Sequence, residues 1–396
     1  MGQSLEKQSV SEQYYLDIVN HFYQMTQQDM YISSRNIPDQ VQEKYEYEQH
    51  NLDHYGAQGL ASSLKKCKKL KNLTLSLEQE NVIDEQAAEQ IGKSMKGLKN
   101  LEQIKLIFQR NYIVESRIID LLSFNLSFFS SLVIFDIGFS GNNQANTKIF
   151  QVLSKLIAKL QQLKGHSIYI DHNQQQNFLG FDDYFRSIST LQEIESFRFN
   201  CNLQMNSYQW YDDIEYCFAR PQLKLKEFQI KVADTLPKDI FQKVCSCFQQ
   251  CQFLEKLVFD LSFLCQSSNN NENISQNDKL NQTLRYLGRC INASKNTLIK
   301  LNINLINFCS MVSWENLICL IEEIQQSQKI QELQILFPFT YHHFKTESKA
   351  KFFQKVSKFK NLNYLIIKTR PQQSYQSIGM LNPIFKIKKL VYYQIK

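Results

Sequence analysis

The sequence predicts an α/β solenoid, in which short parallel strands alternate with helices along one repeating array. A pattern of apolar, two spacers, apolar, one spacer, apolar returns about every 31 residues. Between the copies, apolar residues follow the 3.6-residue period of a helix, and within the strands they alternate with polar ones. A short strand and one helix cannot bury their apolar faces alone, so successive copies should stack and share a core.

The copies of the strand pattern can be followed from Leu70 to the C-terminal region. The first three begin at Leu70, Leu101 and Leu132, at a regular spacing of 31 residues. The fourth, at Leu163, carries His166 where an apolar residue is expected. The remaining copies of the eleven begin at Ile194, Leu225, Leu254, Leu298, Ile330 and Leu362, and the last is expected at Ile387, Leu390 and Tyr392.

Amphipathic helices are expected between these strands, at 149–160, 240–248, 280–291, 314–324 and 352–359. Ser313 precedes the fourth of these segments and is its expected N-cap. Because helices are wider than strands, stacking should bend the array into a curved horseshoe. The parallel strands would then line its concave face and the helices its convex face.

An alternating β/α domain with an open or closed parallel sheet would show the same order of elements. Its strands would be buried on both faces and would read as continuous apolar runs. Here Thr74, Asp136 and Gln229 are among the polar residues at the outward positions of the strands. The alternation therefore favours the solenoid.

The segment from Leu73 to Leu101 resembles a leucine-rich repeat of the ribonuclease-inhibitor-like type. Such repeats have an asparagine near the strand exit and an acidic-x-Gly-Ala helix start, which Asn81, Asp84 and Ala87 match, while other residues replace the glycines. Gly56-Ala57 looks like the helix start of a preceding repeat, whose strand would lie around 45–47. The family binds proteins through its concave face, so the resemblance implies a protein-binding role. The turn asparagine recurs only in early copies, as Asn81, Asn111 and Asn143.

The predicted organisation has an N-terminal helical cap or leader over 1–40, which would cover the open end of the array. Residues 41–396 then form the leucine-rich-repeat array of about 11 to 12 degenerate units. The polar residues of 266–279 lengthen one spacing to 44 residues, and we interpret them as an inserted loop.

Composition and motifs argue against an enzyme. Ten scattered cysteines without a secretory leader indicate reduced thiols in a cytoplasmic protein, and no segment is long and apolar enough to span a membrane. Cys245, Cys247 and Cys251 form the densest cysteine cluster but lack a second ligand pair at zinc-finger spacing. The sequence contains no phosphate-cradling loop or nucleophile elbow, so we expect neither a cofactor nor a metal.

The leading functional hypothesis is a non-catalytic scaffold that holds a protein partner on its concave strand face. The outward residues on which we base it are Lys105, Asp136, Tyr169, Arg198, Gln229, Asn302 and Gln334. An alternative starts from residues 341–396, which carry twelve basic side chains and one acidic one. Nucleic acid or an anionic surface would then bind to Lys351, Lys355 and Lys358. Neither hypothesis specifies the partner or the oligomeric state.

Overall fold

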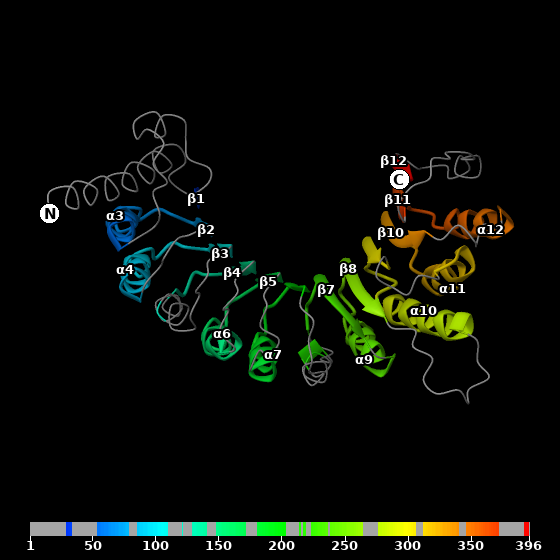
Figure 1. Ribbon diagram of the computed structural model, residues 1–396, viewed down its shortest axis with the longest axis horizontal. Coiled ribbons are helices and arrows are strands. Elements are labelled where there is room, and N and C mark those ends of the chain that lie inside the picture. Colours follow the sequence, from blue (N-terminus) through cyan, green and yellow to red (C-terminus); the bar gives the residue numbers. More distant parts are fainter. Residues whose placement is uncertain are drawn as a thin grey trace. The chain divides into compact units, whose positions relative to one another are not determined.

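The computed structural model contains two compact units, the first extending to Ile194 and the second beginning at Glu195. In each unit, helices cover one face of a parallel sheet whose strands follow one another in chain order (Figure 1). Among the described strands, none returns to an earlier neighbour, so the sheet is open within each unit and forms no closed barrel. The described residues are 29–33, 54–78, 85–109, 121, 129–140, 148–171, 180–202, 214, 217–218, 223–236, 238–263, 276–305, 312–339, 346–371 and 392–395.

The first unit contains five parallel strands, β1 to β5, each hydrogen-bonded to the next. Its described elements are β1 (Asp29–Ser33), α3 (His54–Leu64), β2 (Asn72–Glu78), α4 (Glu85–Met95), β3 (Gln103–Gln109), β4 (Ile134–Ser140), α6 (Ile149–Ile157), β5 (Gly165–Asp171) and α7 (Phe181–Thr190). The first strand lies within the segment 1–40 that was expected to be a helical cap. The expected strand around 45–47 lies outside the described residues.

The second unit contains seven parallel strands, β6 to β12. Its described elements are β6 (Ser196–Asn202), β7 (Glu227–Leu236), α9 (Lys238–Gln249), β8 (Lys256–Phe263), α10 (Gln276–Asn292), β9 (Lys300–Asn304), α11 (Trp314–Ile324), β10 (Glu332–Phe339), α12 (Thr346–Val356), β11 (Tyr364–Pro371) and β12 (Tyr392–Ile395). Residues 276–279 of the expected polar loop form the first turn of α10.

The sequence period sets the register of the strands. Leu73, Ile104 and Phe135 are direct neighbours on β2, β3 and β4, and all three are buried. The second unit repeats this arrangement with Phe228 and Leu257 on β7 and β8. The predicted strand pattern and its shared core are thus confirmed for the copies that pair within each unit.

The last copy is the exception. The pattern predicts that Leu390 pairs with Leu365, but Tyr393 occupies that position, three residues further along the chain. The prediction is wrong here because residues 390–393 are apolar at every position, so either phase of the alternation fits the segment, and the shift of three residues exchanges the residues assigned to the two faces of the strand.

A repeated hydrogen-bond motif joins neighbouring copies where each strand begins. Two consecutive backbone N–H groups donate to a single carbonyl of the preceding copy, as Glu102 and Gln103 do to Lys71 O at 2.8 and 2.9 Å. The same arrangement leads into β4, β5, β7, β8, β9, β10 and β11. We call this the shared-carbonyl motif, and it fixes each new strand to the one before it.

The N-cap prediction for α11 is confirmed, and the cap also joins two helices. Ser313 and Asn316 form a reciprocal capping box, in which the Ser313 N–H donates to Asn316 Oδ1 at 2.7 Å. The buried Asn316 amide also donates to Asn277 and Asn281 of α10, at 2.7 and 2.8 Å. The Asn316 side chain therefore satisfies a backbone N–H group at the start of α11 and also joins α11 to α10 by hydrogen bonds.

His166 explains why the fourth copy departs from the apolar pattern. Its ring is buried, stacks on Phe135 at a centroid distance of 5.4 Å, and lies 2.6 Å from Phe135 O and 2.7 Å from Tyr184 Oη. A carbonyl can only accept, so Nδ1 carries the proton and Nε2 accepts from the Tyr184 hydroxyl. Burial lowers the pKa of His166 to about 4. The imidazole therefore serves as a neutral core side chain.

Candidate functional site

The face of each sheet opposite the helices, which we call the open face, carries the outward strand residues. In the first unit, Lys105 and Asp136 are register neighbours on β3 and β4. Asp136 accepts a hydrogen bond from Ser167 of β5, with a distance of 2.6 Å between Oγ and Oδ1. The residue that continues this row on β5 is therefore Ser167, which sequence reasoning missed because His166 interrupts the apolar pattern and the alternation was counted from Ile168 and Ile170.

Tyr169 lies one step further along the same face and, among the described residues of this unit, is the exposed aromatic one, with 40% of its surface accessible. It pairs with Gly138 in register. A Cβ added at Gly138 would lie 3.8 Å from the Tyr169 ring and 3.9 Å from Ile107. These are ordinary van der Waals distances, so the side chains of Tyr169 and Ile107 flank Gly138 on the face that also carries Lys105 and Asp136.

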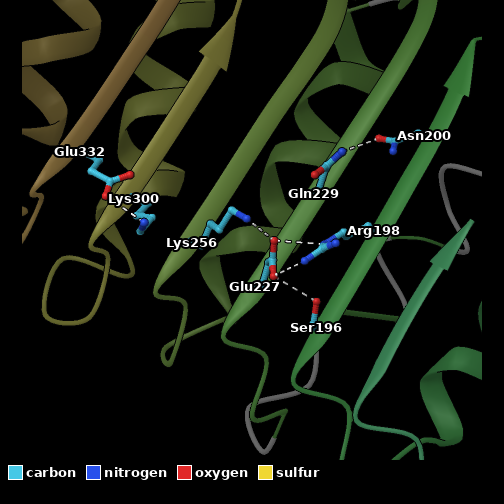
Figure 2. Close-up of polar contacts among 8 residues, drawn as sticks. All are labelled: Ser196, Arg198, Asn200, Glu227, Gln229, Lys256, Lys300 and Glu332. Carbon is cyan, nitrogen blue, oxygen red and sulfur yellow. Dashed lines mark hydrogen bonds and ion pairs between the residues drawn. The ribbon is translucent and has the colours of Figure 1, made fainter. Parts of the chain in front are cut away.

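The open face of the second unit is organised around the carboxylate of Glu227 (Figure 2). Arg198 donates to it through Nε at 3.1 Å and Nη2 at 2.9 Å, Lys256 pairs with it at 2.6 Å, and Ser196 donates at 3.3 Å. Burial raises the pKa of Glu227, but its bonds to Arg198 and Lys256 outweigh that effect and hold the pKa below the usual value. Arg198, expected as a partner anchor, is thus already held within the face.

The other predicted residues of this unit form a row that crosses the same sheet. Arg198, Gln229, Asn302 and Gln334 occupy equivalent register positions on β6, β7, β9 and β10. Gln229 donates to Asn200 at 2.7 Å. The row is therefore confirmed as an alignment of residues, and its role in binding stays a prediction.

One carboxyl of this face is less solvated than its neighbours. Burial raises the pKa of Asp260 on β8, although a hydrogen bond from Asn304 and the charge of Lys231 partly oppose the effect. Asp260 lies between these two residues in register, on β7, β8 and β9. Charged residues of both signs, here Lys231 and Asp260, therefore continue along this face beyond Glu227.

The basic C-terminal helix does not present its lysines as an unbalanced patch. Lys351 pairs with Glu347 at 2.7 Å, and Lys355 pairs with Glu322 of α11 at 2.9 Å. Lys358 is exposed in the turn after α12. Local carboxylates therefore offset two of the three charges on which the alternative hypothesis depended.

The cysteine cluster is part of the core. Cys245, Cys247 and Cys251 are free thiols and are buried, and burial raises the pKa of Cys251 to about 12. The Cys251 thiol donates to Cys247 O over 3.3 Å. Within the described residues, no group of three or more metal-ligating side chains converges. Among those same residues, no helix combines the length and apolar character required to cross a bilayer.

Comparisons with known proteins do not place this chain in a family, so the class of protein is defined here by the fold. No family model and no curated protein matches the sequence. Among solved structures, the chain is similar to a Bacteroides fragilis protein, a target of the Northeast Structural Genomics Consortium. The match covers 73% of this chain and 79% of that chain, with 13% identity and a TM-score of 0.35. The strands and helices described above therefore define this chain as an α/β repeat protein of the solenoid kind.

Proposed function

We propose that this chain is a non-catalytic scaffold that holds another protein on its open face. The observation that carries the proposal is a helix-free sheet face on which polar side chains of both charges lie in register around the exposed Tyr169 ring. Tyrosine is enriched among the residues that dominate protein interfaces, and mixed charges add selectivity. The buried cysteine thiols with raised pKa values, such as Cys67 at about 11, are poor nucleophiles and agree with a non-catalytic role.

We also propose that the repeats are leucine-rich repeats of the ribonuclease-inhibitor-like type. Ala57 and Ala87, which match the family's helix starts, are fully buried, so a larger side chain could not replace them without displacing the core. The turn asparagines of the resemblance, Asn81, Asn111 and Asn143, lie outside the described residues. The support for this type is therefore the strand register and the small buried helix starts.

The open face of the first unit is the better candidate for the partner's contact. Arg198 and Lys256 of the second unit are bound to Glu227, so a partner would have to compete with that carboxylate for them. Lys105 is exposed, and its neighbour Asp136 is bonded to the neutral Ser167. A partner can therefore engage Lys105 and Tyr169 without first breaking an ion pair between the strands that carry them.

A site-specific photo-crosslinking experiment tests this proposal. Tyr169 is replaced by a benzophenone amino acid, and the same amino acid is placed at the exposed Lys155 on α6 as a matched control on the helix-covered side. We expect a protein adduct of one mass from position 169 and none from position 155. The adduct should weaken at least tenfold when Lys105→Glu is added. Identical adducts from both positions, or none from 169 in the native cell extract, would refute the proposal.

A further inference from the structure

Lysines gather on the turns that lead into the first two repeats of the first unit. The turn before β2 carries five and the turn before β3 two, against a single carboxylate, Glu102. We call these seven residues the lysine rim: Lys65, Lys66, Lys68, Lys69, Lys71, Lys96 and Lys99. Six of the seven are exposed, and Lys71 is paired with Glu102 at 2.9 Å. Among the described residues, no carboxylate pairs with Lys66, Lys68 or Lys99.

Hydrogen bonds hold the two turns side by side. Asn100 donates to Lys68 O at 2.8 Å, and the shared-carbonyl motif joins Glu102 to Lys71 O. A Cβ added at Gly97 would lie 2.9 Å from the Lys68 ammonium, so the Lys68 side chain crosses from its own turn over the next one. The two turns are therefore held next to each other, and the Lys68 side chain brings a charge of the first turn onto the second.

A helix end alone does not account for this density of charge. Lysines near a helix C-terminus are stabilised by the helix dipole and by unpaired carbonyls. The same kind of turn in the second unit needs far fewer, because no two neighbouring turns before β7 to β11 carry more than three lysines together. There, Lys226, Lys256 and Lys300 are each paired with a glutamate. The excess in the lysine rim is thus specific to these two turns.

We propose that the lysine rim binds the phosphate backbone of a nucleic-acid duplex. The rim contains lysine and no arginine, and lysine acts as a point charge toward phosphate without reading a base. Lysine is depleted in protein interfaces, which disfavours a protein occupant. The large exposed apolar residues of the described chain, Tyr169 and Phe253, lie outside these turns, so the rim offers no apolar anchor to a membrane. A duplex concentrates its charge along a line, which suits a rim that is one turn wide.

The proposal concerns a surface distinct from the open face and does not depend on a protein partner. The lysines of the rim are also distinct from those of the basic C-terminal helix, two of which are paired with Glu322 and Glu347. If all seven lysines contact phosphates, the slope of log affinity against log salt would approach about −6 for duplex DNA. Binding should tolerate any base sequence, because only the backbone is contacted.

Fluorescence anisotropy with two 24-base-pair duplexes of unrelated sequence tests the proposal on the full chain. The rim variant is Lys66→Glu/Lys68→Glu/Lys99→Glu. The matched control is Lys224→Glu/Lys295→Glu/Lys329→Glu, three exposed lysines of equivalent turns in the second unit. We expect the wild type and the control to bind both duplexes equally. The rim variant should bind at least about tenfold more weakly, with a salt slope reduced by about 3.

Three results would overturn the proposal. They are absence of wild-type binding to duplex at 50 mM salt, equal losses in both variants, and tighter binding to phosphatidylserine vesicles or polyglutamate than to duplex. Circular dichroism establishes that each variant is folded, and Lys→Gln replacements at the same three rim positions provide a milder series if charge reversal unfolds the chain.

Discussion

The buried imidazole of His166 should make the first unit lose stability in mild acid. The pKa of His166 is about 4 in the folded chain against the ordinary value of 6.5. The unfolded state therefore binds more protons between these values, and folding stability falls as the pH drops through that window. At about 1.4 kcal/mol per pH unit, the loss between pH 7.5 and pH 4.5 is about 2–3 kcal/mol.

His166→Leu is the perturbation that isolates this effect. Leucine restores the apolar pattern and removes the proton site, but it leaves Phe135 O and Tyr184 Oη without their partner. Each unpaired buried group costs about 1–3 kcal/mol, so the variant should be the less stable protein at pH 7.5. Tyr184→Phe in the same chain removes one of the two unpaired groups and should recover part of that loss.

Urea unfolding followed by circular dichroism at pH 7.5, 6.0 and 4.5 measures the difference between the two proteins. Hydrogen exchange of residues 165–171 reports the same difference at β5 itself. The gap between wild type and His166→Leu should shrink by about 2–3 kcal/mol from pH 7.5 to 4.5, because only the wild type carries the titrating ring. A gap that stays constant with pH would show that His166 is not held neutral by its surroundings.

Two further substitutions probe a strained position and an ion-pair network. Gly180 has φ +85°, and an added Cβ would clash with the Gln151 side chain, so Gly180→Ala should lower stability by about 1–3 kcal/mol in thermal unfolding. An unchanged melting temperature would contradict the local geometry. Glu227→Gln should cost about 1 kcal/mol at pH 7 and couple to Arg198→Met in a double-mutant cycle. The stability that the ionised Glu227 carboxylate contributes is present above the usual glutamate pKa and is lost as the pH falls through the lowered pKa of the folded chain. Additive effects of the two substitutions at pH 7 would argue against the network.

The strands and helices could be predicted because each depends on a local period. The helix at Trp314–Ile324 and its Ser313 cap match the prediction, since a capping side chain and an amphipathic stripe are both visible in the sequence. By contrast, α12 begins at Thr346, six residues before its apolar stripe at 352. The polar start of that helix resembles a loop in sequence, so only its packed half carried a signal.

The candidate site was predictable only as a row of outward positions. Alternation identified Lys105, Asp136 and Gln229 as outward residues, because burial of their neighbours forces that assignment. It could not show that Glu227 draws Arg198 and Lys256 together, since this depends on side-chain reach across three paired strands. The lysine rim was overlooked for a related reason, because turns adjacent in space are 31 residues apart in the chain.

Because of the shared-carbonyl motif, the segments that lead into the strands tolerate changes in length less well than the segments that lead out of them. Seven residues join α3 to β2 (65–71), α4 to β3 (96–102), α10 to β9 (293–299) and α11 to β10 (325–331). The segments from strand to helix range from one residue (237) to twelve (264–275). Evolution could therefore duplicate or delete whole repeats, or lengthen the strand exits, without breaking the stack. The entry to β8 has six residues (250–255) and keeps the motif, so a strand entry can change length only as far as both donors still reach their common acceptor.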